Sequence, residues 1–435
     1  MVKLKRLKIE KYRNLKPGTE LHFRDSLNVL LGRNGTGKTT LLNLVVQLLR
    51  WDFSQMLEEA FALEYDLESP EGKVMLRVRN DLQAEPTPLE ALMPLLLRTP
   101  LGKRSETSGE LWIALPGEEE VLSLAFAGSK LWWVRPDELI PRQVEHSLPL
   151  IGEGTLFNMA VSVARLFGSK GQPREAEGWG HVLGSMTRTL RVRRFDESLG
   201  YLERITNAVS LYKTVRLDEG NSYATMSEEG EPSGLASHVS RTLKREPGTD
   251  EVKLDANDKG AAFLQRVVAL LEYQSAQLRL QRTARTPPPM EQFLFGNLQF
   301  DFTRRDGSVI NHSLLSYGQK RLLAFYYYQA CNPECVVADE LVNGMHHEWI
   351  DACLEELGDR QAFLTSQNPL LLDYLSFESA EEVRSSFVLC RSALQEDREQ
   401  MVWENMTAED SEGFFKAYQV AIQHVSELLR TRGLW

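Results

Sequence analysis

Residues 32–40 form a glycine-rich segment whose residue types and spacing could bind phosphate. They read GRNGTGKTT, which completes the pattern G-x-x-x-x-G-K-[ST]. In such a segment, glycines let backbone N–H groups approach phosphate oxygens, and the start of the following helix adds the positive end of its dipole. We therefore predict that this segment, the phosphate loop, holds a nucleoside triphosphate.

Two side chains of the phosphate loop have specific expected roles. Lys38 is expected to reach the β- and γ-phosphates, and the Thr39 hydroxyl is expected to complete the coordination of Mg²⁺. The alternative is a glycine-rich turn that binds nothing. The residues of the loop predicted to contact ATP are Gly32, Asn34, Gly35, Thr36, Gly37, Lys38, Thr39 and Thr40.

An acidic pair, Asp339 and Glu340, follows a buried-strand run at residues 335–338. An Asp at the end of a parallel strand beside a phosphate loop can hold Mg²⁺ through water, so we expect Asp339 to be a metal ligand. The adjacent Glu340 is placed to polarise an attacking water molecule. The alternative is a salt-bridged acidic pair at a strand end.

Further segments must position these groups. Residues 27–31 read LNVLL, an apolar run of strand length that delivers the phosphate loop, and residues 41–49 have the apolar character of a helix. Ser316 and Gln319 fit a capping box before a strongly apolar helix, and the exposed N–H groups of such a helix start suit a γ-phosphate. Residues 361–368 form another strand that ends in polar residues.

The composition excludes several classes of protein. The chain has 435 residues, of which 42% are hydrophobic and 26% charged, as expected for two or three globular units. No apolar run approaches the length of a membrane span, and four cysteines are too few for a disulfide scaffold, so we expect a cytoplasmic protein without membrane contacts. The net charge of −11 argues against nucleic-acid binding by the whole surface, although arginines cluster within residues 188–194 and 279–285.

The chain divides into three segments by sequence pattern. Residues 1–150 hold the N-terminal lobe, with the phosphate loop and short β-type runs. Residues 151–290 are predicted to form a mainly helical insertion or lid with a β-hairpin near 212–227. Residues 291–435 form the C-terminal lobe of alternating strands and helices.

The expected fold class is α/β, a mixed sheet flanked by helices and split by a largely helical insertion. Within the insertion, residues 258–282 are predicted to form one amphipathic helix, and the chain is predicted to end in a helix at residues 413–429.

In these motifs the chain resembles the ABC-type ATPases of the SMC, RecF and OLD group. The resemblance covers residues 1–50 and about 291–405, and it implies a P-loop ATPase head that uses ATP and Mg²⁺. Heads of this group start with a strand followed by an aromatic-Arg-Asn turn near the nucleotide, here residues 12–14. In this group two heads sandwich two ATP molecules, so Ser316 of the signature segment (residues 315–321) in one copy would contact the γ-phosphate in the other. The resemblance adds these nucleotide contacts: Arg13, Asn14, Ser316, Gly318 and Gln319.

The sequence departs from this group at three places. Tyr317 replaces the first glycine of the signature, and Val342 and His347 replace the Glu and the Pro of the turn after the catalytic Glu. The switch position after the last strand is usually His and here is Gln367. A neutral hydrogen bond contributes about 1 kcal/mol against about 1.5–3 for a charge-assisted one, so slow turnover is expected. The expected catalytic residues are Glu340, Lys38 and Gln367.

The biological role is implied by the resemblance alone. OLD proteins carry a Toprim nuclease after the ATPase head, and no room for that nuclease is expected after the last predicted strand here. The chain is similar to stand-alone ATPase subunits of anti-phage systems such as PARIS and Septu. That similarity implies an ATP-dependent homodimer or higher oligomer that controls a separate effector nuclease or toxin. The alternatives are a RecF-like DNA-repair clamp on duplex DNA and an ATP-gated scaffold.

Overall fold

The structure is a computed structural model that divides into two compact units. Unit 1 comprises Met1–Val192, Asp359–Thr365 and Leu375–Trp435, and unit 2 comprises Arg193–Gly358 and Ser366–Tyr374. The residues that the structure describes are 1–82, 105–118, 121–127, 130–134, 142–144, 173–195, 211–217, 220–226, 231–246, 248–286, 292–366, 368–395, 398–420 and 424–434.

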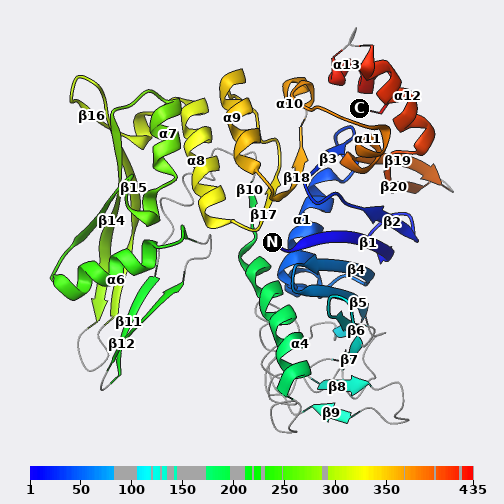
Figure 1. Cartoon of the computed structure of the whole chain (residues 1–435), viewed down its shortest axis with the longest axis horizontal. Helices are drawn as coiled ribbons and strands as arrows, with labels where there is room; N and C mark the ends of the chain where they lie inside the picture. Colours follow the sequence, from blue (N-terminus) through cyan, green and yellow to red (C-terminus); the bar gives the residue numbers. More distant parts are fainter. Residues whose placement is uncertain are drawn as a thin grey trace, which may run out of the picture. The chain divides into compact units, whose positions relative to one another are not determined.

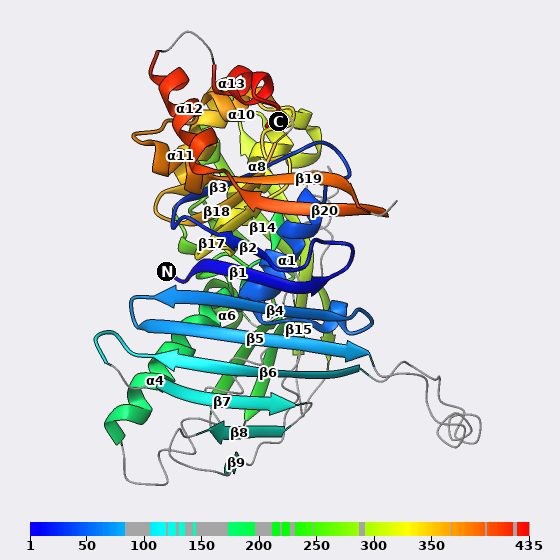
Figure 2. The same cartoon turned by 90° about the vertical axis from the view of Figure 1, so that its right-hand side faces the viewer.

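Unit 1 contains an eight-stranded antiparallel sheet with the order β2-β1-β4-β5-β6-β7-β8-β9 (Figure 2). The strand β4 illustrates how the sequence forms this sheet: along FALEYDLES, buried residues alternate with half-buried ones, which is the two-residue period of a strand. The helix α4 (Pro173–Met186) packs against β4, β5 and β6 and is followed by η2 (Thr187–Arg191). The strands are β1 (Lys3–Tyr12), β2 (Thr19–His22), β4 (Phe61–Ser69), β5 (Gly72–Leu82), β6 (Ser105–Ala114), β7 (Val121–Ala127), β8 (Lys130–Val134) and β9 (Arg142–Val144).

The second sheet of unit 1 carries the phosphate loop. Its strand β3 (Leu27–Leu31) pairs in parallel with β18 (Gln361–Thr365) on one side and β19 (Phe387–Gln395) on the other, and β20 (Arg398–Asn405) pairs antiparallel with β19. A strand that is covered on both faces is mostly apolar, as LNVLL is, and its one polar residue, the buried Asn28, donates to Arg24 O and Ala362 O. The helices of this part are α1 (Lys38–Arg50), η1 (Ser54–Met56), α11 (Ala380–Ser386), α12 (Ala408–Gln419) and α13 (Val425–Thr431).

The single C-terminal helix predicted at residues 413–429 is wrong. Thr407 caps α12, which starts earlier than predicted and ends at Gln419, and α13 starts only at Val425. Phe414 of α12 and Leu428 of α13 are both buried, and they lie about four helical turns apart in sequence. The helical period therefore continues across the break, which is why the pattern did not reveal it.

Unit 2 is built around a four-stranded antiparallel sheet with the order β13-β14-β15-β16. The helices α6 and α7 lie beside this sheet (Figure 1), with α6 in contact with β13 and α7 in contact with β14. A separate parallel pair joins β10 to β17. The elements are β10 (Arg194–Phe195), β11 (Leu211–Leu217), β12 (Gly220–Met226), α6 (Leu235–Arg245), β13 (Glu251–Asp255), η3 (Lys259–Ala261), α7 (Leu264–Leu270), β14 (Ser275–Thr286), β15 (Gln292–Thr303), β16 (Val309–Asn311), η4 (His312–Leu314), α8 (Tyr317–Cys331), β17 (Cys335–Ala338), α9 (His347–Leu357) and α10 (Pro369–Asp373).

The predicted hairpin is confirmed, since β11 and β12 pair antiparallel. The helix predicted over residues 258–282 is wrong, because α7 ends at Leu270 and β14 begins at Ser275. In β14 the buried residues Ala276, Leu278 and Leu280 alternate, which is the period of a strand. The described part of residues 151–290 therefore holds strands as well as helices.

Within the described residues, no helix combines the length and apolar character that crossing a membrane requires.

Candidate nucleotide-binding site

The phosphate loop links the end of β3 to the start of α1 in unit 1. Gly32, Gly35 and Gly37 have φ angles of +151°, +83° and +87°, a region that residues with a side chain rarely adopt. A Cβ on Gly37 would lie 2.6 Å from Met401 Sδ, whereas a Cβ on Gly35 would meet nothing within 4 Å. The loop is thus packed against β20 on one side and open at Gly35, which fits a cradle for phosphate oxygens.

The side chains of the phosphate loop reinforce this shape. Lys38 Nζ donates to the carbonyl oxygens of Gly32 (2.7 Å) and Arg33 (3.1 Å). The Thr36 hydroxyl donates to Arg33 O at 2.8 Å, and Trp403 Nε1 donates to Thr36 O at 3.1 Å. Asn34 and Thr39 are exposed. The ammonium of Lys38 therefore lies at the loop, where a phosphate-binding role requires it.

Burial raises the pKa of a thiol that borders the phosphate loop. Cys390 of β19 is buried, and its carbonyl oxygen would lie 2.1 Å from a Cβ on Gly32. Burial raises the pKa of the Cys390 thiol to about 12, and the positive charge of Lys38 opposes this in part. The thiol is thus neutral near pH 7 and acts as an apolar wall of the site.

The turn formed by Arg13 and Asn14 lies beside the phosphate loop in unit 1. Met401 joins them, because its N–H donates to Asn14 O at 3.0 Å while its sulfur lies at Gly37. Arg13 makes a bidentate pair with Glu59, with both N···O distances 2.7 Å, and these hydrogen bonds lower the pKa of the Glu59 carboxyl. The proximity expected for this turn is present, and its contact with a nucleotide stays a prediction.

The acidic pair lies in unit 2, directly after the buried strand β17. Asp339 follows its last residue, and its N–H donates to Phe195 O of the parallel neighbour β10 at 2.8 Å. One carboxylate oxygen of Asp339 accepts from Arg194 Nη1 at 3.1 Å. Asp339 therefore presents a hard oxygen ligand of the kind Mg²⁺ prefers, and it also forms the strand-end salt bridge that was the alternative.

Glu340 has a φ of +49°, in the left-handed region that is unfavourable for a residue with a side chain. Such a backbone costs about 1–3 kcal/mol and persists where the surroundings fix it. Arg321 of α8 supplies that fixation, because its Nη2 donates to Glu340 O at 2.7 Å and to Asp339 O at 3.3 Å. Its guanidinium lies over the Phe195 ring, 4.5 Å from the centroid.

Sequence reasoning missed Arg194 and Arg321. Arg194 lies 145 residues before Asp339, and no local pattern connects the two. Arg321 offered one signal, a charged residue directly before the apolar run LLAF of α8 that is nevertheless only 3% exposed. A buried charge requires strong hydrogen bonds, so an Arg inside an apolar helix face indicates a structural partner.

The capping box predicted at Ser316 is confirmed. Ser316 Oγ accepts from the Gln319 N–H at 3.4 Å, and the Ser316 N–H donates to Gln319 Oε1 at 2.9 Å. Gly318 lies against the turn after the acidic pair, because a Cβ there would be 2.5 Å from Gly344 O. Unit 2 therefore brings together the signature residues and the acidic pair.

Gln367 lies outside the described residues. Its neighbours are described, and Ser366 is buried while Asn368 caps the start of α10 with its side chain. The predicted catalytic role of Gln367 stays a prediction.

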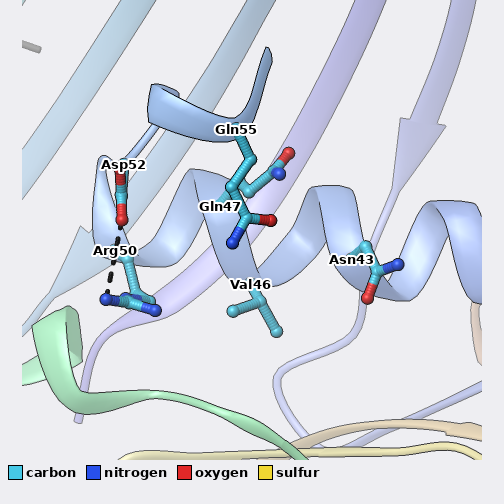
Figure 3. Close-up of a pocket in the computed structure, with 6 residues that line it drawn as sticks. All are labelled: Asn43, Val46, Gln47, Arg50, Asp52 and Gln55. Carbon is cyan, nitrogen blue, oxygen red and sulfur yellow. Dashed lines mark ion pairs between the residues drawn. The ribbon is translucent and has the colours of Figure 1, made fainter. Parts of the chain in front are cut away.

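A polar cavity of about 160 Å³ lies further along α1 (Figure 3). Figure 3 shows the ion pair between Arg50 and Asp52, at 3.6 Å, on its wall. None of the residues that line the cavity is a predicted nucleotide contact, so the cavity is separate from the predicted ATP site. The lining residues are Asn43, Val46, Gln47, Arg50, Asp52 and Gln55.

Solved structures similar to the chain are SMC heads and RecF. The SMC head bound to the C-terminal winged-helix domain of ScpA is 9% identical, covers 93% of this chain and 98% of its own, and gives a TM-score of 0.39. The SMC head domain from Thermotoga maritima is 11% identical, with 93% and 99% covered and a TM-score of 0.35. The recombination mediator protein RecF is 12% identical, with 84% and 93% covered and a TM-score of 0.28. Similarity this low carries no argument about substrate or partner.

Two family models match the chain. A model described as an AAA domain matches residues 6–79, which include the phosphate loop. A model described as an AAA domain, putative AbiEii toxin, Type IV TA system, matches residues 185–373, which include the signature and the acidic pair. No curated protein sequence matches the chain. The chain therefore carries two stretches similar to AAA domains, residues 6–79 with the phosphate loop and residues 185–373 with Ser316 and the acidic pair.

Proposed function

We propose that the protein binds Mg-ATP and hydrolyses it slowly, as a dimer in which two copies enclose two nucleotides. The observation that carries this proposal is the phosphate loop, a complete motif whose glycines adopt the backbone angles of a cradle and whose Lys38 lies on that cradle. Helix α1 starts at Lys38, so its N-terminal N–H groups and dipole favour an anion at the loop.

The residues of this chain divide the chemistry among them. Lys38 neutralises phosphate charge, while Thr39 and Asp339 hold Mg²⁺, which supplies further charge stabilisation when bound. Glu340 orients and polarises the attacking water. Because Glu340 is only 3% exposed and its backbone is fixed by Arg321, its carboxylate has little freedom to leave a productive position.

The signature segment supports contact with a second copy. Ser316 is exposed at the capped start of α8, where N–H groups are available to an anion. Leu314 and Tyr317 on either side are 74% and 41% exposed, which is unusual for large apolar side chains. A second copy that presents its phosphate loop here would cover both, and Ser316 would contact the bound γ-phosphate.

Slow hydrolysis follows from Gln367 at the switch position. A neutral amide stabilises developing phosphate charge less than an imidazolium does. The variant Gln367→His is expected to increase turnover, and an unchanged rate would show that Gln367 takes no part.

For the biological role, we propose a sensor or scaffold subunit of a bacterial anti-phage system that controls a separate effector nuclease or toxin. The proposal rests on the resemblance to stand-alone ATPase subunits, and the family model for residues 185–373 adds a link to toxin systems, since its description reads AAA domain, putative AbiEii toxin, Type IV TA system. This role requires a partner protein whose release depends on hydrolysis.

The alternative is a RecF-like clamp on duplex DNA, and three arginines of the two clusters have acidic partners within the chain. Arg188 pairs with Glu71 at 3.7 Å, and Arg279 pairs with Glu251 at 3.0 Å. Arg282 also pairs with an acidic residue. Arginines whose charge is matched within the chain attract phosphates less strongly than free ones.

The deciding experiment uses Glu340→Gln, co-expressed with its flanking genes and purified with Mg-ATP. We expect a stable ATP-bound dimer by light scattering and a co-purifying effector that the hydrolysing wild type releases. Lys38→Ala, treated identically, should give neither. A monomeric Glu340→Gln with bound ATP would contradict the dimer, and recovery of salt-sensitive duplex DNA alone would favour the clamp.

A further inference from the structure

Within unit 2, the signature helix α8 contacts the segment after β17, residues 339–344, at two places. Its first turn meets Gly344, because Gly318 lies against the carbonyl of Gly344 and the Tyr317 ring covers its Cα. Its second turn meets the acidic pair through Arg321. Residues 339–344 are therefore held at both ends by one helix.

The contact at Gly344 is close on the side that faces α8, although Gly344 and the Tyr317 ring are themselves exposed. Gly344 has a φ of +74°, and a Cβ there would lie 2.2 Å from the Tyr317 ring, while a Cβ on Gly318 would lie 2.5 Å from Gly344 O. Gly318 is buried, so its contact with Gly344 O is the close-packed part of this junction, and close-packed contacts transmit displacement. A shift of the start of α8 must therefore move the turn at residues 343–344.

The contact at Arg321 fixes the acidic pair itself. One nitrogen, Nη2, bonds the carbonyls of both Asp339 and Glu340, and Phe195 supports the face of the guanidinium. Charge-assisted hydrogen bonds of this kind are short and directional. They act on the backbone of Glu340, whose left-handed conformation determines where its carboxylate points.

We infer that Arg321 is a positioning residue that couples the signature segment to Glu340. Contact of Ser316 with the nucleotide of a second copy then sets, through α8 and Arg321, whether Glu340 of the same chain is ready for hydrolysis. This inference rests on the proposed function, and it assigns to α8 the control of turnover by dimer formation. Arg suits this role better than Lys, because its planar fork can stack on Phe195 while it donates to the carbonyls.

The test compares Arg321→Gln and Arg321→Lys with Lys320→Gln, a matched control that removes the neighbouring positive charge of the same helix. We expect Arg321→Gln to lower kcat about a hundredfold through misplacement of Glu340, with KM for ATP and ATP-dependent dimerisation unchanged. Arg321→Lys should recover part of kcat, and Lys320→Gln should behave as wild type.

Hydrogen exchange gives a readout that does not depend on activity. In wild type, ATP should slow the exchange of peptides that span residues 339–345, and Arg321→Gln should lose this response while the response at residues 32–40 remains. A normal kcat in Arg321→Gln, or an unchanged response at residues 339–345, would overturn the inference.

A second variant covers the case in which Arg321→Gln fails to fold. Tyr317→Ala loosens the same junction at Gly344, and because the proposed dimer also covers this ring, its kcat is measured at a protein concentration at which light scattering shows the ATP-bound dimer. Under this condition we expect kcat to fall about tenfold by the same misplacement of Glu340. A folded Tyr317→Ala with wild-type kcat would overturn the coupling. Failure of the proposed function would look different, because wild type and Lys320→Gln would then also lack ATP binding.

Discussion

The phosphate loop of unit 1 and the acidic pair of unit 2 are built in different ways. The loop is local, since the strand before it, its glycines and the helix after it are contiguous in sequence. The acidic pair depends on residues far away in sequence, Arg194 through its carboxylate and Arg321 through its carbonyls. The loop should therefore keep its shape when residues elsewhere in the chain are substituted, whereas the acidic pair should be sensitive to substitutions in distant segments.

The two regions also differ in whether backbone groups or side chains are important. The loop is proposed to act through backbone N–H groups, the Lys38 ammonium and the Thr39 hydroxyl, while the hydrogen bonds of Lys38 and Thr36 to loop carbonyls maintain its shape. In the acidic pair, side chains of other elements hold the Asp339 carboxylate and the backbone carbonyls of both residues. We therefore expect substitutions to separate ATP binding, the proposed role of the loop, from hydrolysis, the proposed role of the acidic pair.

The largest expected effect is on the loop side. Lys38→Ala should weaken ATP binding at least about a hundredfold, because the cation at the β- and γ-phosphates is lost. Isothermal titration calorimetry measures this directly. Lys73→Ala, which removes an exposed lysine of β5, is the control, and equal affinity in the two variants would show that the loop binds without its lysine.

A pair of glycine substitutions tests the shape of the loop. Gly37→Ala should destabilise unit 1 by about 2–4 kcal/mol, because positive φ and a collision with Met401 add together. Gly35→Ala should cost only about 1–2 kcal/mol, because its φ is also positive but its surroundings are open. Urea unfolding checks both values, and equal losses would mean that β20 does not restrict the loop.

On the acidic-pair side, Arg194→Gln should lower the stability of the chain by about 1–2 kcal/mol. The reason is that Asp339, only 9% exposed at its side chain, loses the pairing with an arginine that is itself 25% exposed. Saturating Mg²⁺ should reduce the loss by neutralising the carboxylate. Thermal unfolding with and without Mg²⁺ measures this, and Arg191→Gln, an exposed neighbour, should show no change.

The smallest expected effect is a pH dependence at the loop. Because burial raises the folded-state pKa of Cys390 to about 12, its contribution to stability is present below the ordinary thiol pKa of about 8.5 and is lost as the pH rises toward 12. Between pH 8.5 and 9.5 we expect a loss of about 1 kcal/mol from this thiol. Urea unfolding at the two pH values should show a smaller loss in Cys390→Ala than in wild type.

Secondary structure could be predicted from the sequence where a short local pattern specifies it, and could not where one pattern fits both a helix and a strand. The capping box at Ser316 and the hairpin of β11 and β12 follow from short-range turn and cap chemistry. The sequence of β14 fits a helix as well as a strand, because its arginines and leucines satisfy both periods over short stretches, and only its pairing with β13 and β15 selects the strand.

The sequence by itself determined the phosphate loop, the acidic pair and their order, because contiguous residues carry the backbone and charge requirements of phosphate binding. The tertiary structure alone decided what fixes the acidic pair. A left-handed Glu340, held by Arg321 over Phe195, depends on three segments whose approach is set by packing, and no spacing along the chain encodes that approach.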